Sequence, residues 1–127
     1  MSREINFRAW DNANKKWLNK DDAEDLIIRL DGSYEINKGW AIIEPDLTIE
    51  QYTGLKDKNG KKIYEGDIVK IEAYSRVFQV VYRKWDCSFV YENDEDEEIV
   101  HMFSGFPSAY EIIGNIHENP ELLGGEE

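Results

Sequence analysis

Short stretches in which apolar and polar side chains alternate every second residue recur along this chain, and glycine, asparagine or aspartate separates them. A period of two residues places successive side chains on opposite faces of a β-strand. Asn-Gly and Asp-Gly pairs supply the tight turns that join such strands. The pattern therefore predicts a mostly β fold, a small barrel or sandwich, and does not favour alternating strands and helices.

The first half of the chain contains several predicted strands. They are expected at residues 5–10, from Trp17 onward, and at 26–30, 34–36, 40–43 and 48–52. Asp11 to Asn14 reads as a turn, because Asn and Asp side chains bond their own backbone nearby. Asp31-Gly32 predicts a hairpin between residues 26–30 and 34–36. A short helix over residues 22–30 is the competing interpretation, and periodicity does not decide between the two.

The second half repeats the pattern. Turns are predicted at Asn59-Gly60 and Gly66-Asp67, and strands at 68–74, 77–85, 88–91, 99–103 and 110–117. Residues 93–98 read as a solvated loop. Asn119 as cap and Pro120 at the first helical position predict a helical turn over residues 121–123.

Length and composition indicate one soluble domain, residues 1–127, since domains most often have about 100–150 residues. Hydrophobic residues make up 41% of the chain, which is too many for a disordered protein. Cys87 is the single cysteine, so an intrachain disulfide is excluded and a reducing compartment is indicated. No signal peptide and no apolar run of membrane-spanning length is present. These features predict a cytoplasmic location.

Negative charge is concentrated near the C-terminus. The formal net charge is −12, and the segment from Glu92 onward holds 11 of the 27 acidic residues and no lysine or arginine. Such a segment repels phosphate backbones and attracts basic surfaces. It either contributes to binding a basic partner or simply keeps the protein soluble.

Three blocks, in this order, resemble the YopX family of phage and prophage proteins. They are REINFRAWD at residues 3–11, QYTGLKD at 51–57 continuing to IYEGDIV at 63–69, and IGNIHENPELL at 113–123. With short flanks they cover about 50 of the 127 residues. The resemblance implies an all-β, barrel-like antiparallel domain made in a bacterial host. It implies no reaction and therefore no catalytic residue.

The middle block allows two interpretations. Its glycines and the side chains of Asp57 and Asp67 suit turns and bulges, as do Asp11 and Asn115 in the other blocks, and aromatic side chains such as Tyr52 and Tyr64 suit cross-strand packing. Alternatively, part of the block forms an exposed recognition face around the Asn59-Gly60 loop. The residues of this candidate interaction surface are Tyr52, Lys56, Asp57, Lys58, Asn59 and Tyr64.

Residue types that carry catalysis or bind metals do not form a recognisable pattern. The two histidines, His101 and His117, have no ligand spacing of a zinc site, and residues 94–98 lack the glycine and later glutamate of a calcium loop. Cys87 is expected to be a buried, inert thiol. The sequence thus predicts no enzyme, no metal and no cofactor.

Three functions remain for comparison. The first is a non-enzymatic, phage-encoded β-barrel module that binds a host or phage protein, either as a monomer or as a homo-oligomer. The second is a weak nucleic-acid-binding module that uses Lys56, Lys58, Lys61 and Lys62, although the overall negative charge opposes it. The third is an enzyme acting on small molecules, which requires a deep pocket with convergent titratable groups. The first is the prediction, with no membrane and no nucleic acid as partner.

Overall fold

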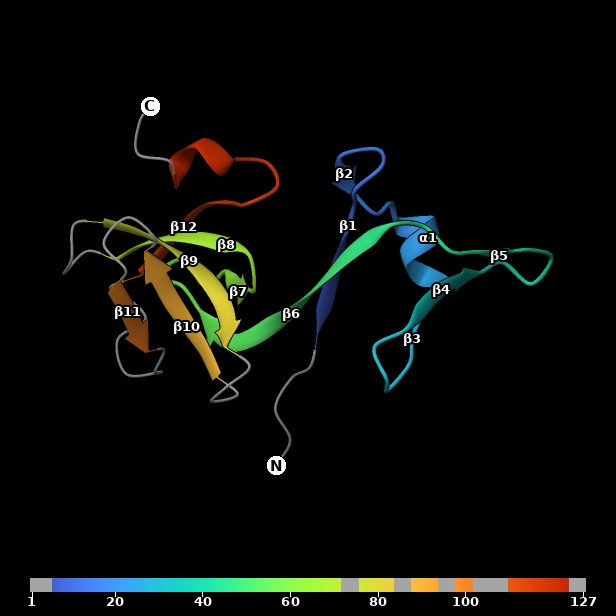
Figure 1. The fold of residues 1–127 in the computed structure, drawn as a ribbon, viewed down its shortest axis with the longest axis horizontal. Coiled ribbons are helices and arrows are strands. Elements are labelled where there is room, and N and C mark those ends of the chain that lie inside the picture. Colours follow the sequence, from blue (N-terminus) through green and yellow to red (C-terminus); the bar gives the residue numbers. More distant parts are fainter. Residues whose placement is uncertain (1–5, 72–75, 84–87, 94–97, 102–109, 124–127) are drawn as a thin grey trace. The chain divides into compact units, whose positions relative to one another are not determined.

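The computed structural model describes residues 6–71, 76–83, 88–93, 98–101 and 110–123, drawn in colour in Figure 1. Several sequence expectations lie outside these residues. They are the strand ends at 72–74, 84–85 and 102–103, the thiol of Cys87, and most of the acidic loop at 93–98.

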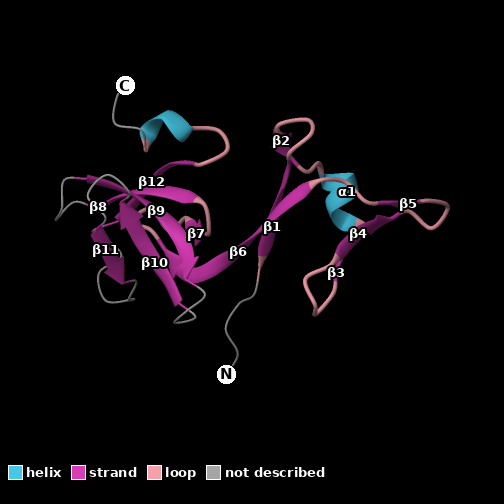
Figure 2. Ribbon diagram, viewed as in Figure 1, coloured by secondary structure: helices cyan, strands magenta, loops and turns pink. Residues whose placement is uncertain are grey.

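Strands dominate the described chain (Figure 2), and the expected mostly β class is confirmed. The strands are β1 Phe7–Asp11, β2 Lys16–Trp17, β3 Leu26–Ile28, β4 Tyr34–Asn37, β5 Ile42–Ile43, β6 Leu47–Lys56, β7 Lys62–Tyr64, β8 Asp67–Ile71, β9 Arg76–Arg83, β10 Ser88–Asn93, β11 Glu98–His101 and β12 Tyr110–Asn115. The α-helix α1 spans Lys20–Glu24, and a 3₁₀ turn spans Pro120–Leu122.

The described residues form three sheets. Their strand orders are β2-β1-β6-β7, β11-β10-β9-β8-β12 and β3-β4-β5. The five-stranded sheet is antiparallel and curls into half a barrel, as the resemblance implied.

The chain divides into two compact units. The first contains residues 1–7 and 50–127, and the second contains Arg8–Ile49. Strand β6 begins in the second unit and ends in the first. The sequence-based assignment of one YopX-like domain over residues 1–127 stays a prediction, and each unit is described by itself below.

Turn chemistry organises the start of the second unit, as the sequence predicts. One carboxylate oxygen of Asp11 accepts the backbone N–H groups of Ala13 and Asn14 at 3.0 and 3.1 Å. The amide of the Asn14 side chain donates to the other oxygen at 2.7 Å, and these bonds lower the pKa of Asp11. The turn returns the chain so that Trp17 of β2 pairs with Trp10 of β1.

Both competing interpretations of residues 22–30 are realised, one after the other. The helix α1 begins after Asn19, whose side-chain oxygen accepts the N–H of Asp22, and it ends at Glu24. Strand β3 then pairs with β4 through the predicted hairpin, in which Gly32 adopts φ +90°. The helix therefore does not reach residues 26–30.

The strand predicted at residues 40–43 is wrong in its first half. Asn37 accepts the N–H of Gly39 through its side-chain oxygen, Gly39 has φ +87°, and the N–H of Lys38 donates to the carbonyl of Ala41. These bonds make a turn that contains Trp40, so β5 begins only at Ile42.

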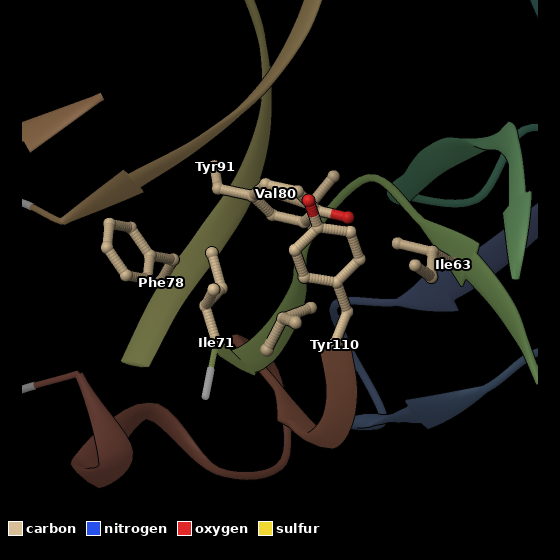
Figure 3. Close-up of a cluster of buried hydrophobic side chains, with 7 residues drawn as sticks. Ile63, Ile71, Phe78, Val80, Tyr91 and Tyr110 are labelled. Carbon is tan, nitrogen blue, oxygen red and sulfur yellow. The ribbon is translucent and has the colours of Figure 1, made fainter. Parts of the chain in front are cut away.

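The core of the first unit fills the concave side of the half-barrel. Its largest cluster of buried residues comes from β7, β8, β9, β10 and β12, and Figure 3 labels most of them. They are Ile63, Val69, Ile71, Phe78, Val80, Tyr91 and Tyr110. The rings of Tyr91 and Tyr110 lie 5.0 Å apart, and burial raises the pKa of Tyr91. Packing of this kind is the main stabilising contribution in a domain of this size.

The segment after β12 differs from the prediction in where the strand ends and in what the Asn119 side chain binds. Strand β12 ends at Asn115, two residues before the predicted limit, because the side-chain oxygen of Asn115 accepts the N–H groups of His117 and Glu118. The Asn119 side chain does not cap the following 3₁₀ turn; its oxygen accepts the N–H of Asn115 at 3.3 Å.

Candidate functional site

Asp57 fixes the turn between β6 and β7, the centre of the candidate interaction surface. One of its carboxylate oxygens accepts the N–H groups of Asn59 and Lys61 at 2.9 and 3.0 Å. The other accepts the N–H of Ile112 in β12 at 3.0 Å. Its side chain is buried, so the carboxylate holds together two segments far apart in the sequence.

The same turn lies along the free side of β12. The N–H of Lys58 donates to the carbonyl oxygen of Tyr110 at 2.9 Å, and the Lys58 ammonium lies 3.4 Å from the carboxylate of Glu111. The carbonyl of Tyr110 and the N–H of Ile112, two backbone groups at the edge of the five-stranded sheet, thus have hydrogen-bond partners in this turn. The turn therefore covers part of the edge strand β12.

The pKa of Asp57 reflects two opposing effects. Burial raises the pKa of this carboxyl, but the N–H groups of Ile112, Lys61 and Asn59 bind the charged form, and the result is a pKa below the ordinary 3.8. Asp57 is therefore a charged structural anchor of the turn.

The structure separates the six predicted surface residues into two groups. Lys56, Lys58 and Asn59 are exposed, and Tyr64 is half-buried. Tyr52 and Asp57 are buried, so the expectation that they lie on an exposed face is wrong. Binding of a partner by the exposed residues stays a prediction.

Tyr52 and Tyr64 instead pack against each other, as the cross-strand interpretation expects. They are register partners of β6 and β7, and their ring centroids lie 5.7 Å apart. At the end of the lysine-rich loop, residues 56–62, the Lys62 ammonium lies 5.4 Å from the centroid of the Tyr52 ring. Three lysines of that loop, at positions 56, 58 and 61, are exposed.

A second buried cluster joins Glu50 of β6 to His117, which follows β12. The Glu50 carboxylate lies 2.9 Å from His117 Nε2, and the two side chains are 4% and 11% exposed. Gly66 packs directly against this carboxylate, so that no Cβ fits there. Its N–H donates to Val80, and its carbonyl accepts from Ile116, at 2.8 and 2.9 Å.

Sequence reasoning did not single out Glu50, because a lone glutamate in a strand has no distinguishing signal. It recognised Gly66 and Asn115 as turn residues, and both contribute to the cluster: Asn115 shapes the turn that carries His117. A carboxylate and an imidazole are not a catalytic site without a nucleophile or an oriented substrate. The cluster links three parts of the chain, those that carry Glu50, Gly66 and His117.

The sheet β3-β4-β5 of the second unit exposes apolar side chains that the strand pattern did not reveal. Leu30 and Trp40, in the two turns of the sheet, are 109% and 85% exposed. Ile42 is 61% exposed, and Ile27 and Ile43 also lie in contact with solvent. We call these five residues the apolar surface of the β3-β4-β5 sheet.

Register places part of this surface on one face of the sheet. Ile27 is opposite Glu35, and Ile42 is opposite Asn37, so all four side chains point to the same side. On that side the Arg29 guanidinium lies 2.7 Å from the Glu35 carboxylate, which also accepts a bond from Asn37. Ile27 and Ile42 thus flank a polar row whose hydrogen bonds are made within the sheet.

The described residues contain neither a group of metal ligands nor a membrane-spanning helix. Within residues 6–71, 76–83, 88–93, 98–101 and 110–123, no three histidine, cysteine or carboxylate side chains gather as metal ligands would. In the same part of the chain, no helix has the length and apolar character needed to cross a membrane.

Comparison with known proteins agrees with the resemblance of the three blocks. Protein EF1440 from Enterococcus faecalis is 33% identical, with a TM-score of 0.61 over 96% of this chain and 99% of its own. YopX from Bacillus subtilis is 22% identical, with a TM-score of 0.55 over 92% of this chain and 96% of its own. This likeness shows that the two proteins share a fold. No curated protein sequence matches. The family model described as YopX protein matches residues 6–124, and the chain therefore belongs to the YopX family.

Proposed function

We propose that this chain is a non-enzymatic interaction module of a phage or prophage, which binds a protein in the cytoplasm of the bacterial host. The observation that carries the proposal is the exposure of Leu30 and Trp40 on one small sheet. Family membership supports the phage context through the resemblance described above.

The apolar surface has the composition of a binding site. Tryptophan is enriched among residues that dominate binding energy, and clustered exposed apolar residues mark interaction surfaces. The core of the second unit does not require these side chains, since Ile36, on the opposite face of β4 from Glu35, is the buried residue of this sheet at 2% exposure. Binding a partner supplies the missing burial for Leu30 and Trp40.

The test uses the full chain as bait in host lysate, followed by reconstitution with the purified captured protein. Leu30→Ser combined with Trp40→Ser should weaken the reconstituted complex by at least roughly tenfold in Kd, measured by calorimetry. Tyr82→Ser, which removes another exposed aromatic residue from β9, should leave it unchanged. Equal affinity of the double variant, or failure to reconstitute any captured protein, contradicts the proposal.

The lysine-rich loop supports nucleic acid as a rival partner. Lys56, Lys58 and Lys61 are exposed, but of the two nearby aromatic rings Tyr52 is buried with the Lys62 ammonium above it, and Tyr64 is half-buried and packs against Tyr52, which leaves little surface for base stacking. Gel shifts with single- and double-stranded DNA and RNA at low salt should show no binding. A shift abolished when the three exposed lysines are replaced by alanine would favour the rival.

A further inference from the structure

The charges around the apolar surface specify the chemistry of its partner. The segment of residues 20–46, which forms α1 and the β3-β4-β5 sheet, holds eight acidic and three basic residues. Two of the three bases are engaged inside the unit. Arg29 pairs with Glu35, and the Lys38 ammonium lies 2.9 and 2.8 Å from Asp22 and Asp25.

Two exposed acids directly adjoin the apolar residues. Asp31 follows Leu30, and Glu44 follows Ile43. The Asp31 carboxylate accepts bonds from the N–H and hydroxyl of Ser33, which lower the pKa of Asp31 and keep it charged at neutral pH. The Arg29 guanidinium, paired with Glu35, also attracts both of these acids, but with eight acids against three bases the segment around the apolar side chains remains negatively charged.

We infer that the apolar surface of the β3-β4-β5 sheet binds a protein segment whose apolar side chains are flanked by lysine or arginine. The inference rests on the proposed function and names the partner's chemistry. A second copy of the chain would bring an identical acidic border, and a net charge of −12, against the first. Electrostatic complementarity therefore favours a basic partner over self-association.

The position of β5 suits an extended partner. It is the outer strand of its sheet, and both of its side chains, Ile42 and Ile43, are exposed. A segment lying beside such an edge presents alternate side chains to the same face. Main-chain hydrogen bonds to β5 would hold such a segment beside Ile42 and Ile43 and next to the exposed Glu44.

The probe is a short synthetic peptide that alternates valine with lysine. Control peptides replace either its lysines by glutamate or its valines by serine. Titration into the ¹⁵N-labelled full chain should shift the amide signals of Ile27 and Ile42 and the indole signal of Trp40. Both control peptides should bind at least roughly tenfold more weakly, and added salt should weaken the valine–lysine complex.

Matched variants separate the apolar and charged parts of the interaction. Leu30→Ser with Trp40→Ser should weaken peptide binding roughly tenfold. Asp31→Asn with Glu44→Gln should weaken it roughly fivefold, since exposed charge pairs contribute modestly. Glu92→Gln with Glu121→Gln makes the same change in net charge elsewhere and should have no effect, which controls for attraction to the chain as a whole.

The outcomes distinguish this inference from the proposed function. Equal binding of the valine–glutamate peptide, or no binding of the valine–lysine peptide, overturns the basic partner, while a reconstituted partner that depends on Trp40 would still support the function. Concentration-dependent self-association in sedimentation, abolished by the Leu30 and Trp40 variants, would make a second copy the occupant. Peptide shifts confined to β10 and β11 would place the attraction on the acidic C-terminal segment.

Discussion

Asp57 shows how one side chain supports two strands and a loop at once. Its carboxylate accepts three backbone N–H groups, from Asn59, Lys61 and Ile112, and its burial makes each bond sensitive to protonation. A neutral carboxyl binds such donors less well than a carboxylate does. The turn that covers the edge of β12 therefore depends on the ionised form of Asp57.

This dependence predicts a pH effect. The folded protein holds the pKa of Asp57 below its ordinary value of 3.8, so on acidification the unfolded chain binds the proton first. The stabilisation is complete above about pH 5 and is lost as the pH falls below about 4. Urea unfolding at a series of pH values should show wild type more stable than Asp57→Asn by about 2 kcal/mol at neutral pH, with the difference shrinking in acid.

Asp31 provides the control for this prediction. It is also a carboxylate with a lowered pKa in a turn, but it is exposed and its bonds are local. Asp31→Asn should change stability by less than about 0.5 kcal/mol at any pH tested. A pH-independent difference between wild type and Asp57→Asn would contradict the proposed role of the Asp57 charge.

Gly66 is constrained by a neighbour as well as by its backbone. Its φ of +89° already disfavours a side chain, and a Cβ would collide with the Glu50 carboxylate. That carboxylate cannot move aside cheaply because it is buried and bonded to His117. We expect Gly66→Ala to lower the free energy of unfolding by about 3 kcal/mol, measured by urea denaturation.

Gly60→Ala is the matched control, because Gly60 has φ +80° but no atom within 4 Å of an added Cβ. It should cost about 1 kcal/mol, the backbone component alone. Equal costs at the two positions would show that the contact with Glu50 contributes nothing. A double-mutant cycle of Glu50→Ala with Gly66→Ala should then give a coupling energy near zero.

At the scale of single elements, the sheet β3-β4-β5 separates residues that stabilise the fold from residues that are free to bind. Ile36 of β4 is buried, whereas Leu30 and Trp40 in the adjoining turns are exposed. Ile36→Ala should cost about 3 kcal/mol, as for other buried isoleucines. Leu30→Ser with Trp40→Ser should change stability by less than about 0.5 kcal/mol in thermal and urea unfolding. A large loss would mean that these side chains support the fold, which would contradict the proposed binding surface.

The sequence predicts an element well when the residues that determine it lie close together along the chain. Local signals succeed: Asp11 and Asp31 bond backbone groups two or three residues away, and both turns occur where expected. They fail at Trp40, whose β-propensity suggests a strand although Gly39 turns the chain there. Propensity is a weak guide when a single positive φ decides the direction of the backbone.

The candidate sites depend on contacts that no local pattern contains. Ile112 lies 55 residues from Asp57, and His117 lies 67 residues from Glu50. The sequence identified Asp57 as a turn anchor, but the burial that removes it and Tyr52 from the predicted recognition face arises from the folded sheet. Likewise, alternation alone does not show that Ile42 faces solvent, because that depends on which strands pair and where the sheet ends.

At the scale of the whole molecule, the two units differ in how much of their structure is fully buried. Strands β8, β9 and β10 contribute Val69, Phe78, Val80, Val90 and Tyr91, all at 0% exposure. Among the described residues of β3, β4 and β5, only Ile36 is buried. Local opening costs less free energy where fewer apolar contacts must be broken. The second unit should therefore open more readily than the first.

Hydrogen exchange followed by NMR measures this difference directly. The amides of β9, which is hydrogen-bonded on both sides by β8 and β10, should exchange at least roughly tenfold more slowly than those of β4. The contrast matters for function, because a sheet of low local stability adapts to a partner at little cost, while the half-barrel keeps its core intact. Equal protection of β4 and β9 would mean that both units open in one cooperative step, and the predicted single domain would then also be a single unit of unfolding.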